Sequence, residues 1–307
     1  MARACIVGSL CGCVPCDTYG VSLRAWWIGA RPRTLPAAVV PVAVGTAAGA
    51  RSGEIVWWLA ALSLLVSVAL QVGVNFANDY SDGVRGTDEG RTGPVRLVAS
   101  GMAQPSHVRA AAALSIGVAA TGGAVAAAAT SWWLLAIGAA SIVAAVLYTG
   151  GPNPYGYLGL GEVFVFVFFG VVATCGTAFV ATGSVDAVVA LTSVPVGLLA
   201  VALLMANNLR DIPSDQRSGK RTLAVRLGDA AMRKVFVGTF VAIATGLVLV
   251  TAIVPWSGIS LLGVVVAVGP VRRVLNGAAG RDLVPVLEGA ARVQLLVGLL
   301  LVAGLSI

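Results

Sequence analysis

Residues 187–206 read AVVALTSVPVGLLAVALLMA and run directly into NNLRDIPSD at 207–215. The first part contains no charged side chain and is about as long as an α-helix must be to cross the hydrocarbon core of a bilayer. The second part places acidic, basic and amide side chains where that helix reaches the membrane boundary. This stretch therefore predicts a membrane-spanning helix with polar chemistry at one end.

Eight further apolar runs lie on either side of this stretch. Their length and their lack of strict alternation favour helices over strands, although many of their residues are β-branched. Across the chain 58% of residues are hydrophobic and only 11% are charged, which excludes a disordered chain, a coiled coil and a soluble enzyme. We predict an all-α integral membrane protein with nine transmembrane helices, at 34–50, 55–76, 108–128, 132–149, 161–181, 186–206, 235–254, 257–271 and 293–307.

The 20 Lys and Arg residues leave the chain with a net charge of +7, and their placement predicts its orientation. With nine spans and a cytoplasmic N-terminus, every Lys and Arg except Arg51 falls on the cytoplasmic side, as the positive-inside rule predicts. Topology thus accounts for the positive charge, and we predict no nucleic-acid partner. The long loops at 77–107, 207–234 and 272–292 face the cytoplasm, so we expect the active site on that side.

Residues 1–24 differ from the rest of the chain because they hold four of its five cysteines: Cys5, Cys11, Cys13 and Cys16. Cysteines at this spacing could form a metal site or carry a lipid anchor. The further ligands usual for zinc are missing, however, and the apolar run before Cys11 is too short for a lipoprotein signal. We interpret residues 1–24 as a loosely ordered cytoplasmic tail and residues 25–307 as one membrane domain.

Six of the 13 acidic residues lie in two segments, NDYSDGVRGTDE at 78–89 and NNLRDIPSD at 207–215. Each segment begins where a predicted span ends on the cytoplasmic side, and each contains Asn-x-x-x-Asp. The two segments are four spans apart and therefore have the same orientation in the membrane. This pattern predicts two four-helix units plus a ninth helix around a central cavity.

The spacing of these acids predicts a metal site. On continuous helices, Asp79 and Asp82 would share one face, as would Asp211 and Asp215, and like charges so placed repel unless a cation lies between them. Mg²⁺ prefers such oxygen ligands together with substrate phosphates, so two clusters facing one cavity would hold a diphosphate. The candidate ligands are Asn78, Asp79, Asp82, Asn207, Asp211 and Asp215, with the role of Asp88 left open; the candidate diphosphate-binding residues are Arg96, Arg210, Lys220 and Arg221.

Four stretches resemble the UbiA superfamily of intramembrane aromatic prenyltransferases, and within it the 1,4-dihydroxy-2-naphthoate polyprenyltransferases. They are ARPRTLP at 30–36, the acidic segment 78–88, YTGGP at 148–152 with YGYLGLGE at 155–162, and the second acidic segment at 207–215. The resemblance extends from about Trp26 to the C-terminus. One departure is Gly86, where many members of the superfamily carry another Asp.

The resemblance implies Mg²⁺-dependent transfer of a polyprenyl group from polyprenyl diphosphate to 1,4-dihydroxy-2-naphthoate with decarboxylation, which gives demethylmenaquinol in menaquinone biosynthesis. It implies a bacterial cytoplasmic membrane, with the bilayer and the two substrates as partners, and gives no oligomeric state. Asp79, Asp82, Asp211 and Asp215 would be catalytic. Glu162, Tyr148 and Tyr155 would border the aromatic acceptor, although Glu162 could instead stabilise a helix N-terminus and tyrosines are common at membrane interfaces.

Two other functions remain open at this point. The same chemistry could act on another aromatic acceptor, such as 4-hydroxybenzoate or homogentisate. A secondary transporter would also show internal repeats and polar groups within the membrane, but it would place them near the midplane rather than at one face.

Overall fold

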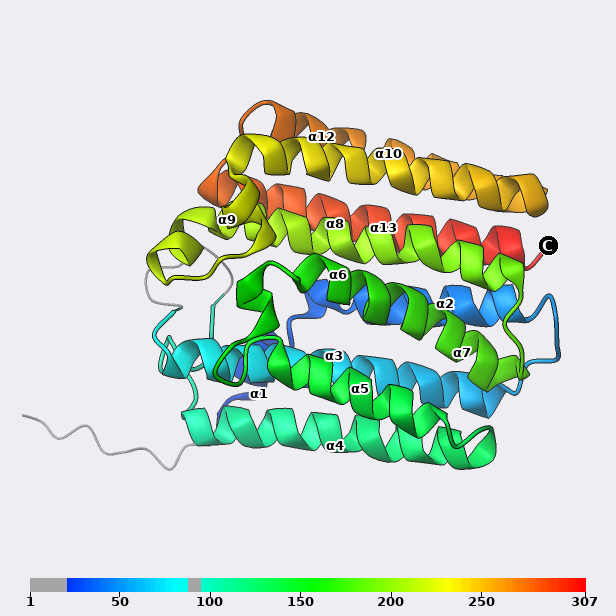
Figure 1. Ribbon diagram of the computed structural model, residues 1–307, viewed down its shortest axis with the longest axis horizontal. Coiled ribbons are helices and arrows are strands. Elements are labelled where there is room, and N and C mark those ends of the chain that lie inside the picture. The colour runs from blue at the N-terminus through cyan, green and yellow to red at the C-terminus, as the bar shows by residue number, and fades with distance from the viewer. Residues whose placement is uncertain (1–20, 88–94) are drawn as a thin grey trace, which may run out of the picture.

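The computed structural model describes residues 21–87 and 95–307, and within these ranges the chain is helical with no β-strand (Figure 1). The predicted cysteine-rich tail therefore lies almost wholly outside the described residues. The α-helices are α1 (Leu23–Ala30), α2 (Pro36–Gly49), α3 (Trp57–Val84), α4 (Pro105–Ala129), α5 (Leu134–Leu147), α6 (Gly161–Val165), α7 (Ala173–Thr182), α8 (Ala187–Arg217), α9 (Leu223–Leu227), α10 (Asp229–Ile253), α11 (Leu261–Val265), α12 (Val268–Leu275) and α13 (Val284–Leu305). Short 3₁₀ segments are η1 (Pro32–Thr34), η2 (Tyr155–Leu158), η4 (Pro255–Ser260) and η5 (Gly280–Leu283), and η3 (Phe166–Val172) is a π-helix.

Six continuous helical segments of the described chain are long and apolar enough to cross a membrane, and a bent pair raises the number to seven if it counts as one span. The pair is Pro255–Val265 with Val268–Leu275, bent by 42°. The remaining two predicted spans, 34–50 and 132–149, coincide with α2 and α5, which have 14 residues each. A helix of that length rises only ~21 Å, against a hydrocarbon core of about 30 Å. The membrane-protein fold is thus supported, while the count of nine spans is not confirmed.

Two helices are long enough to carry polar residues beyond the apolar core. Helix α3 has 28 residues and continues through Asp79 and Asp82 before it ends at Val84, whereas α8 has 31 residues and continues through the whole second acidic segment. Their acidic ends lie at the same end of the bundle, on the left in Figure 1. The two helices therefore deliver both clusters to one region of the protein.

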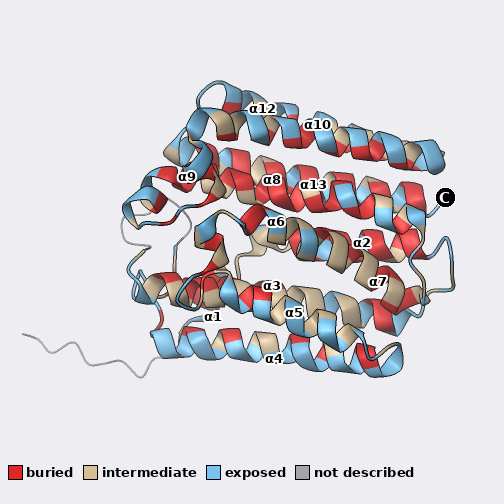
Figure 2. Ribbon diagram, viewed as in Figure 1, coloured by how far each residue is buried: buried red, intermediate tan, exposed pale blue. Residues whose placement is uncertain are grey.

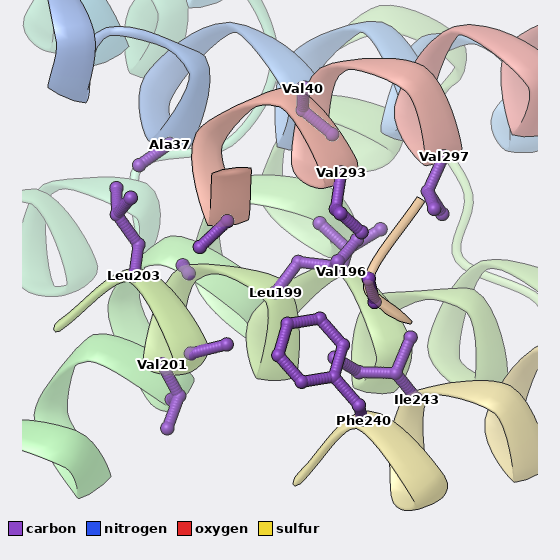
Figure 3. Close-up of a cluster of buried hydrophobic side chains, with 14 of the residues drawn as sticks. Ala37, Val40, Val196, Leu199, Val201, Leu203, Phe240, Ile243, Val293 and Val297 are labelled. Atoms are coloured by element: carbon purple, nitrogen blue, oxygen red, sulfur yellow. The ribbon is translucent and has the colours of Figure 1, made fainter. Parts of the chain in front are cut away.

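Helix α8 lies at the centre of the main hydrophobic core. Of its apolar window 67% is buried, compared with 28% to 50% in the other five continuous spans. Val196 and Leu199 of α8 pack with Ile243 of α10 and Val293 of α13, and Figure 2 shows buried residues along most of α8 and α13 (Figures 2 and 3). The second acidic cluster is therefore fixed to the most buried of the six continuous spans.

Candidate active site

A cavity of about 1450 Å³ runs through the bundle between α3, α4, α5, α7 and α8. Along α3 its lining residues recur every three or four positions from Ser63 to Asp82, so the cavity follows one face of that helix. These 19 residue steps correspond to ~28 Å along the helix axis. We call the end lined by Asn78, Asp82, Asp211, Asp215 and Lys220 the polar end.

Asp82 joins the first acidic cluster to the basic stretch that follows the second cluster. Its Oδ1 accepts a hydrogen bond from Lys220 Nζ at 3.1 Å, and Lys220 belongs to the basic stretch that follows α8. Arg96 Nη2 lies 3.9 Å from the other carboxylate oxygen. Asp82 is only 3% exposed, so its charge depends on these cationic neighbours. The ion pair with Lys220 joins chain segments that are 138 residues apart.

Asp79 has different surroundings from those predicted for it. Its carboxylate is fully buried and accepts hydrogen bonds from the backbone N–H groups of Leu97 at 2.9 Å and Val98 at 3.0 Å. It does not line the cavity, whereas Asn78 and Asp82 do. Two helical residues that are four positions apart differ by ~40° around the helix axis, so Asn78 and Asp82 share a face. Asp79 is turned ~100° from Asn78.

The second cluster is built on a buried pair of adjacent residues. Arg210 Nε and Nη2 donate to the two carboxylate oxygens of Asp211 at 2.8 and 2.9 Å, and Arg210 is 2% exposed. Both residues line the cavity together with Asp215 one helical turn later. The pair places a guanidinium beside a carboxylate at the polar end, which suits an anionic ligand held through a cation.

The chain returns from α8 toward the cavity through a tight turn. The backbone N–H of Lys220 donates to the carbonyl of Asp215 at 2.8 Å, and Gly219 between them has a φ of 76°. That left-handed conformation is readily available only to glycine. Gly219 therefore lets the chain reverse so that the Lys220 side chain reaches Asp82.

Tyr157 is a site residue for which the sequence analysis predicted no role. Its hydroxyl donates to Asp82 Oδ1 at 2.6 Å, and Lys220 Nζ lies 4.6 Å from the centre of its ring. Burial and the neighbouring Asp82 carboxylate raise the pKa of Tyr157 above its ordinary value. Burial alone would lower the pKa of Lys220, but Asp82 and Tyr157 outweigh it and raise that pKa. At neutral pH Tyr157 is therefore a neutral donor and Lys220 a cation.

The loop that carries Tyr155 and Tyr157 is tied to the end of α3. Thr149 Oγ1 donates to Asn78 Oδ1 at 2.8 Å, while Ser81 Oγ and Arg85 Nη1 both donate to the Thr149 carbonyl. Arg85, like Tyr157, was not predicted to contribute. These bonds hold the loop over the polar end of the cavity.

The three residues predicted at the aromatic acceptor divide into two groups. Tyr148 and Tyr155 line the cavity with their ring centres 5.5 Å apart, and Tyr155 stacks on Phe164 at 3.9 Å. Glu162 is buried but does not line the cavity, and its Oε1 accepts a hydrogen bond from Asn208 Nδ2 at 2.9 Å. Asn208 does line the cavity, so Glu162 orients the Asn208 side chain from outside the cavity wall.

The donor set at the polar end fits Mg²⁺. No three His, Cys, Asp or Glu side chains of the described chain converge at metal-binding distance, so a site made of protein carboxylates alone is not present there. Mg²⁺ instead commonly uses one or two carboxylates together with substrate phosphates. Asp82, Asp211 and Asp215, with Asn78 and Asn207, present such oxygen donors to one cavity from two helices.

The family model described as the UbiA prenyltransferase family matches residues 38–281, which is most of the chain. The chain belongs to the UbiA prenyltransferase family. A 1,4-dihydroxy-2-naphthoate octaprenyltransferase of Mycobacterium tuberculosis is 49% identical over 92% of this chain and 97% of its own length. The protein of the same name from Escherichia coli is 34% identical over 92% of this chain and 95% of its own. A UbiA homologue from Archaeoglobus fulgidus, solved bound to GPP and Mg²⁺, superposes with a TM-score of 0.64 at 14% identity, covering 90% of this chain and 99% of that one.

This UbiA prenyltransferase brings most of the predicted site residues to one cavity. The lining includes Asn78, Asp82, Arg96, Tyr148, Tyr155, Asn207, Arg210, Asp211, Asp215 and Lys220. Asp79 and Glu162 lie behind it, and Arg221 is exposed outside it. Asp88 lies outside the described residues. For Tyr157 the only sequence signal was its position within the stretch YGYLGLGE that resembles the family.

Proposed function

We propose that this protein transfers a polyprenyl group from polyprenyl diphosphate to 1,4-dihydroxy-2-naphthoate with loss of CO₂, forming demethylmenaquinol for menaquinone biosynthesis. The relatives named 1,4-dihydroxy-2-naphthoate octaprenyltransferase, at 49% and 34% identity over nearly the whole chain, support this acceptor. The observation that carries the proposal is the cavity itself. It joins carboxylates and buried cations at one end to a long apolar interior, which suits a substrate with a diphosphate head and an isoprenoid tail.

Asp82, Asp211 and Asp215, with Asn78 and Asn207, would hold Mg²⁺ at the polar end. The bound metal supplies Lewis-acid stabilisation of the diphosphate leaving group. Arg96, Arg210 and Lys220 line the same end and neutralise the charge that develops on the diphosphate as the allylic C–O bond breaks.

The rest of the cavity keeps the reacting carbon from water and presents the acceptor. Its walls are mostly apolar, so an allylic cation formed there meets the naphthoate ring rather than bulk solvent. Tyr148 and Tyr155 offer aromatic faces beside the polar end, and Asn208, oriented by Glu162, offers a hydrogen-bonding group. These positions support the acceptor side predicted from the sequence, with Glu162 in an indirect role.

The protein would lie in a bacterial cytoplasmic membrane with its N-terminus and the polar end of the cavity on the cytoplasmic side. We propose that α2 and α5 complete nine crossings, arranged as two four-helix units and a ninth helix. Single cysteines at Arg217 and Ser184, in a chain otherwise free of cysteine, test the proposed orientation, because these positions flank α8. A membrane-impermeant maleimide added to intact cells should label the Ser184→Cys variant only, and the reverse result contradicts the orientation.

The activity is tested with purified protein, Mg²⁺, octaprenyl diphosphate and one of three acceptors. Mass spectrometry should detect a decarboxylated, prenylated product with 1,4-dihydroxy-2-naphthoate and none with 4-hydroxybenzoate or homogentisate. A product with one of the latter two acceptors alone would retain the chemistry but overturn the proposed acceptor.

A further inference from the structure

The cavity continues far beyond the polar end. Its remote part is lined by Ser63 of α3, Gly123 of α4, Leu134 and Gly138 of α5, and Gly176 of α7. We call this part the far end. It lies toward the right-hand end of the bundle in Figure 1, where α4 and α7 end and α5 begins.

Three glycines on three different helices face the cavity at one level. Gly123 is six residues before the end of α4, Gly138 is four residues after the start of α5, and Gly176 is six residues before the end of α7. At 1.5 Å per residue these positions lie ~6–9 Å from the ends of their helices. All three line the cavity, so each contributes to its wall at the far end.

Helix packing does not account for these glycines. A Cβ added at Gly123, Gly138 or Gly176 would meet no atom within 4 Å. By contrast, a Cβ at Gly45 or Gly170 would come within 3 Å of a neighbouring backbone, which explains why glycine is needed there. Glycine weakens a helix interior relative to alanine. What the three glycines provide is open space within the cavity.

The chemistry of the far end points to one occupant. Its lining is apolar apart from Ser63, and it lies along the same α3 face as Asp82, at the other end of a ~28 Å path. A diphosphate held at the polar end would direct its isoprenoid tail along this path. A short tail would stop before the glycines, whereas a long tail would extend past them.

We propose that Gly123, Gly138 and Gly176 determine the longest prenyl chain that the enzyme accepts, because their lack of side chains leaves room for a long isoprenoid tail to pass. This inference rests on the proposed prenyl transfer and adds to it the residues that select chain length. Side chains at these positions narrow the path without touching the polar end.

The test compares geranyl and octaprenyl diphosphate as donors for 1,4-dihydroxy-2-naphthoate in wild type and in Gly123→Leu, Gly138→Leu and Gly176→Leu. Each variant should lower kcat/KM for the octaprenyl donor by at least about tenfold, a typical cost of misfit in an apolar pocket, while the geranyl value stays within about twofold. Gly117→Leu is the matched control. Gly117 lies on α4, is exposed, and has open space around its added Cβ, but it does not line the cavity.

The outcomes separate this inference from the proposed function. If wild type converts both donors and the leucine variants keep the wild-type ratio, the glycines do not select chain length. The same conclusion follows if Gly117→Leu shifts the ratio as much as the others. If wild type converts neither donor, the proposed function itself fails. Turnover of geranyl diphosphate shows whether each variant is folded. Where a leucine variant does not fold, the matching alanine variant replaces it. We expect alanine to change the ratio of the two kcat/KM values in the same direction but by less.

Discussion

Asp79 and Asp82 are three residues apart on α3 and both are buried, yet they contact different partners. The carboxylate of Asp79 accepts two backbone N–H groups from the segment that contains Arg96, whereas that of Asp82 contacts side chains that line the cavity. A carboxylate held by backbone donors fixes the position of a chain segment, and one beside buried cations can exchange partners with a ligand. The two side chains point in different directions around the axis of α3, so Asp79 positions the segment after it and Asp82 faces the cavity.

Asp82→Asn should lower kcat by orders of magnitude, because it removes a negatively charged oxygen donor from the cavity that Asp211 and Asp215 also line. The amount of Mg²⁺ needed for half-maximal activity should rise. The control is Asp229→Asn, which alters an exposed ion pair with Arg233 on α10 and should leave kcat unchanged. Near wild-type turnover in Asp82→Asn would contradict the assigned role.

Asp79→Asn should act mainly on stability. The new amide group faces a backbone N–H of Leu97 or Val98, which leaves a buried donor unpaired and costs about 1–3 kcal/mol. We expect a lower free energy of unfolding in detergent and an unchanged Mg²⁺ requirement in the remaining active protein. A raised Mg²⁺ requirement without loss of stability would instead make Asp79 a metal ligand.

Tyr157→Phe should lower kcat by about 10–100-fold, since a hydrogen bond to a charged group is worth about 1.5–3 kcal/mol. The variant keeps the ring that lies beside Lys220 and removes only the donor to Asp82. Tyr80→Phe on α3 serves as the control, because Tyr80 lies outside the cavity lining. Equal activity of the two variants would show that the Tyr157 hydroxyl is dispensable.

At the scale of elements, helix ends do most to form the site. The last turns of α3 and α8 carry the acids, and the turn after α8 brings Lys220 back to Asp82. The core around α8 keeps these ends in register, because its side chains pack against α2, α10 and α13. The site therefore depends on where α3 and α8 end and on the turn that follows α8, as well as on where these helices cross the membrane.

Gly219→Ala and Gly183→Ala form a matched pair that tests the turn after α8. Both glycines have φ near +76°, and neither has an atom within 4 Å of an added Cβ. Each alanine should cost about 1–2 kcal/mol of stability through backbone strain. Only Gly219→Ala should also reduce kcat, because it displaces Lys220, whereas Gly183 lies in the turn after α7. Equal kcat in both variants would show that the turn does not position Lys220.

The helices also show which parts of the fold could be predicted from the sequence and which could not. Span length predicted a helical membrane protein, and the described chain has six continuous helices long and apolar enough to cross a membrane. Asp79 and Asp82 lie on α3 and the whole second acidic segment lies on α8, as predicted. The shortness of α2 and α5 could not be anticipated from apolar runs, because such runs continue past the helix ends. Tyr157 and Arg85 were missed because their partners are distant in sequence: Tyr157 is 75 residues from Asp82, and Arg85 is 64 residues from Thr149.

At the scale of the whole molecule, a single cavity connects a charged end to an apolar interior. Chelation with EDTA should therefore abolish turnover, and added Mg²⁺ should restore it, because the carboxylates at the polar end need a divalent cation to accept a diphosphate beside them. Product formation measured before and after chelation checks this expectation. Full activity in EDTA would remove the metal from the mechanism.

The cavity also has a consequence for the lifetime of the protein in the cell. Most protein interiors are closely packed, but this one leaves about 1450 Å³ to be filled by its substrates. A ligand that binds only the folded state stabilises it in proportion to the logarithm of its concentration. Chains starved of prenyl donor should therefore open more often and be degraded sooner. The abundance of this membrane protein would then rise and fall with the supply of its own donor.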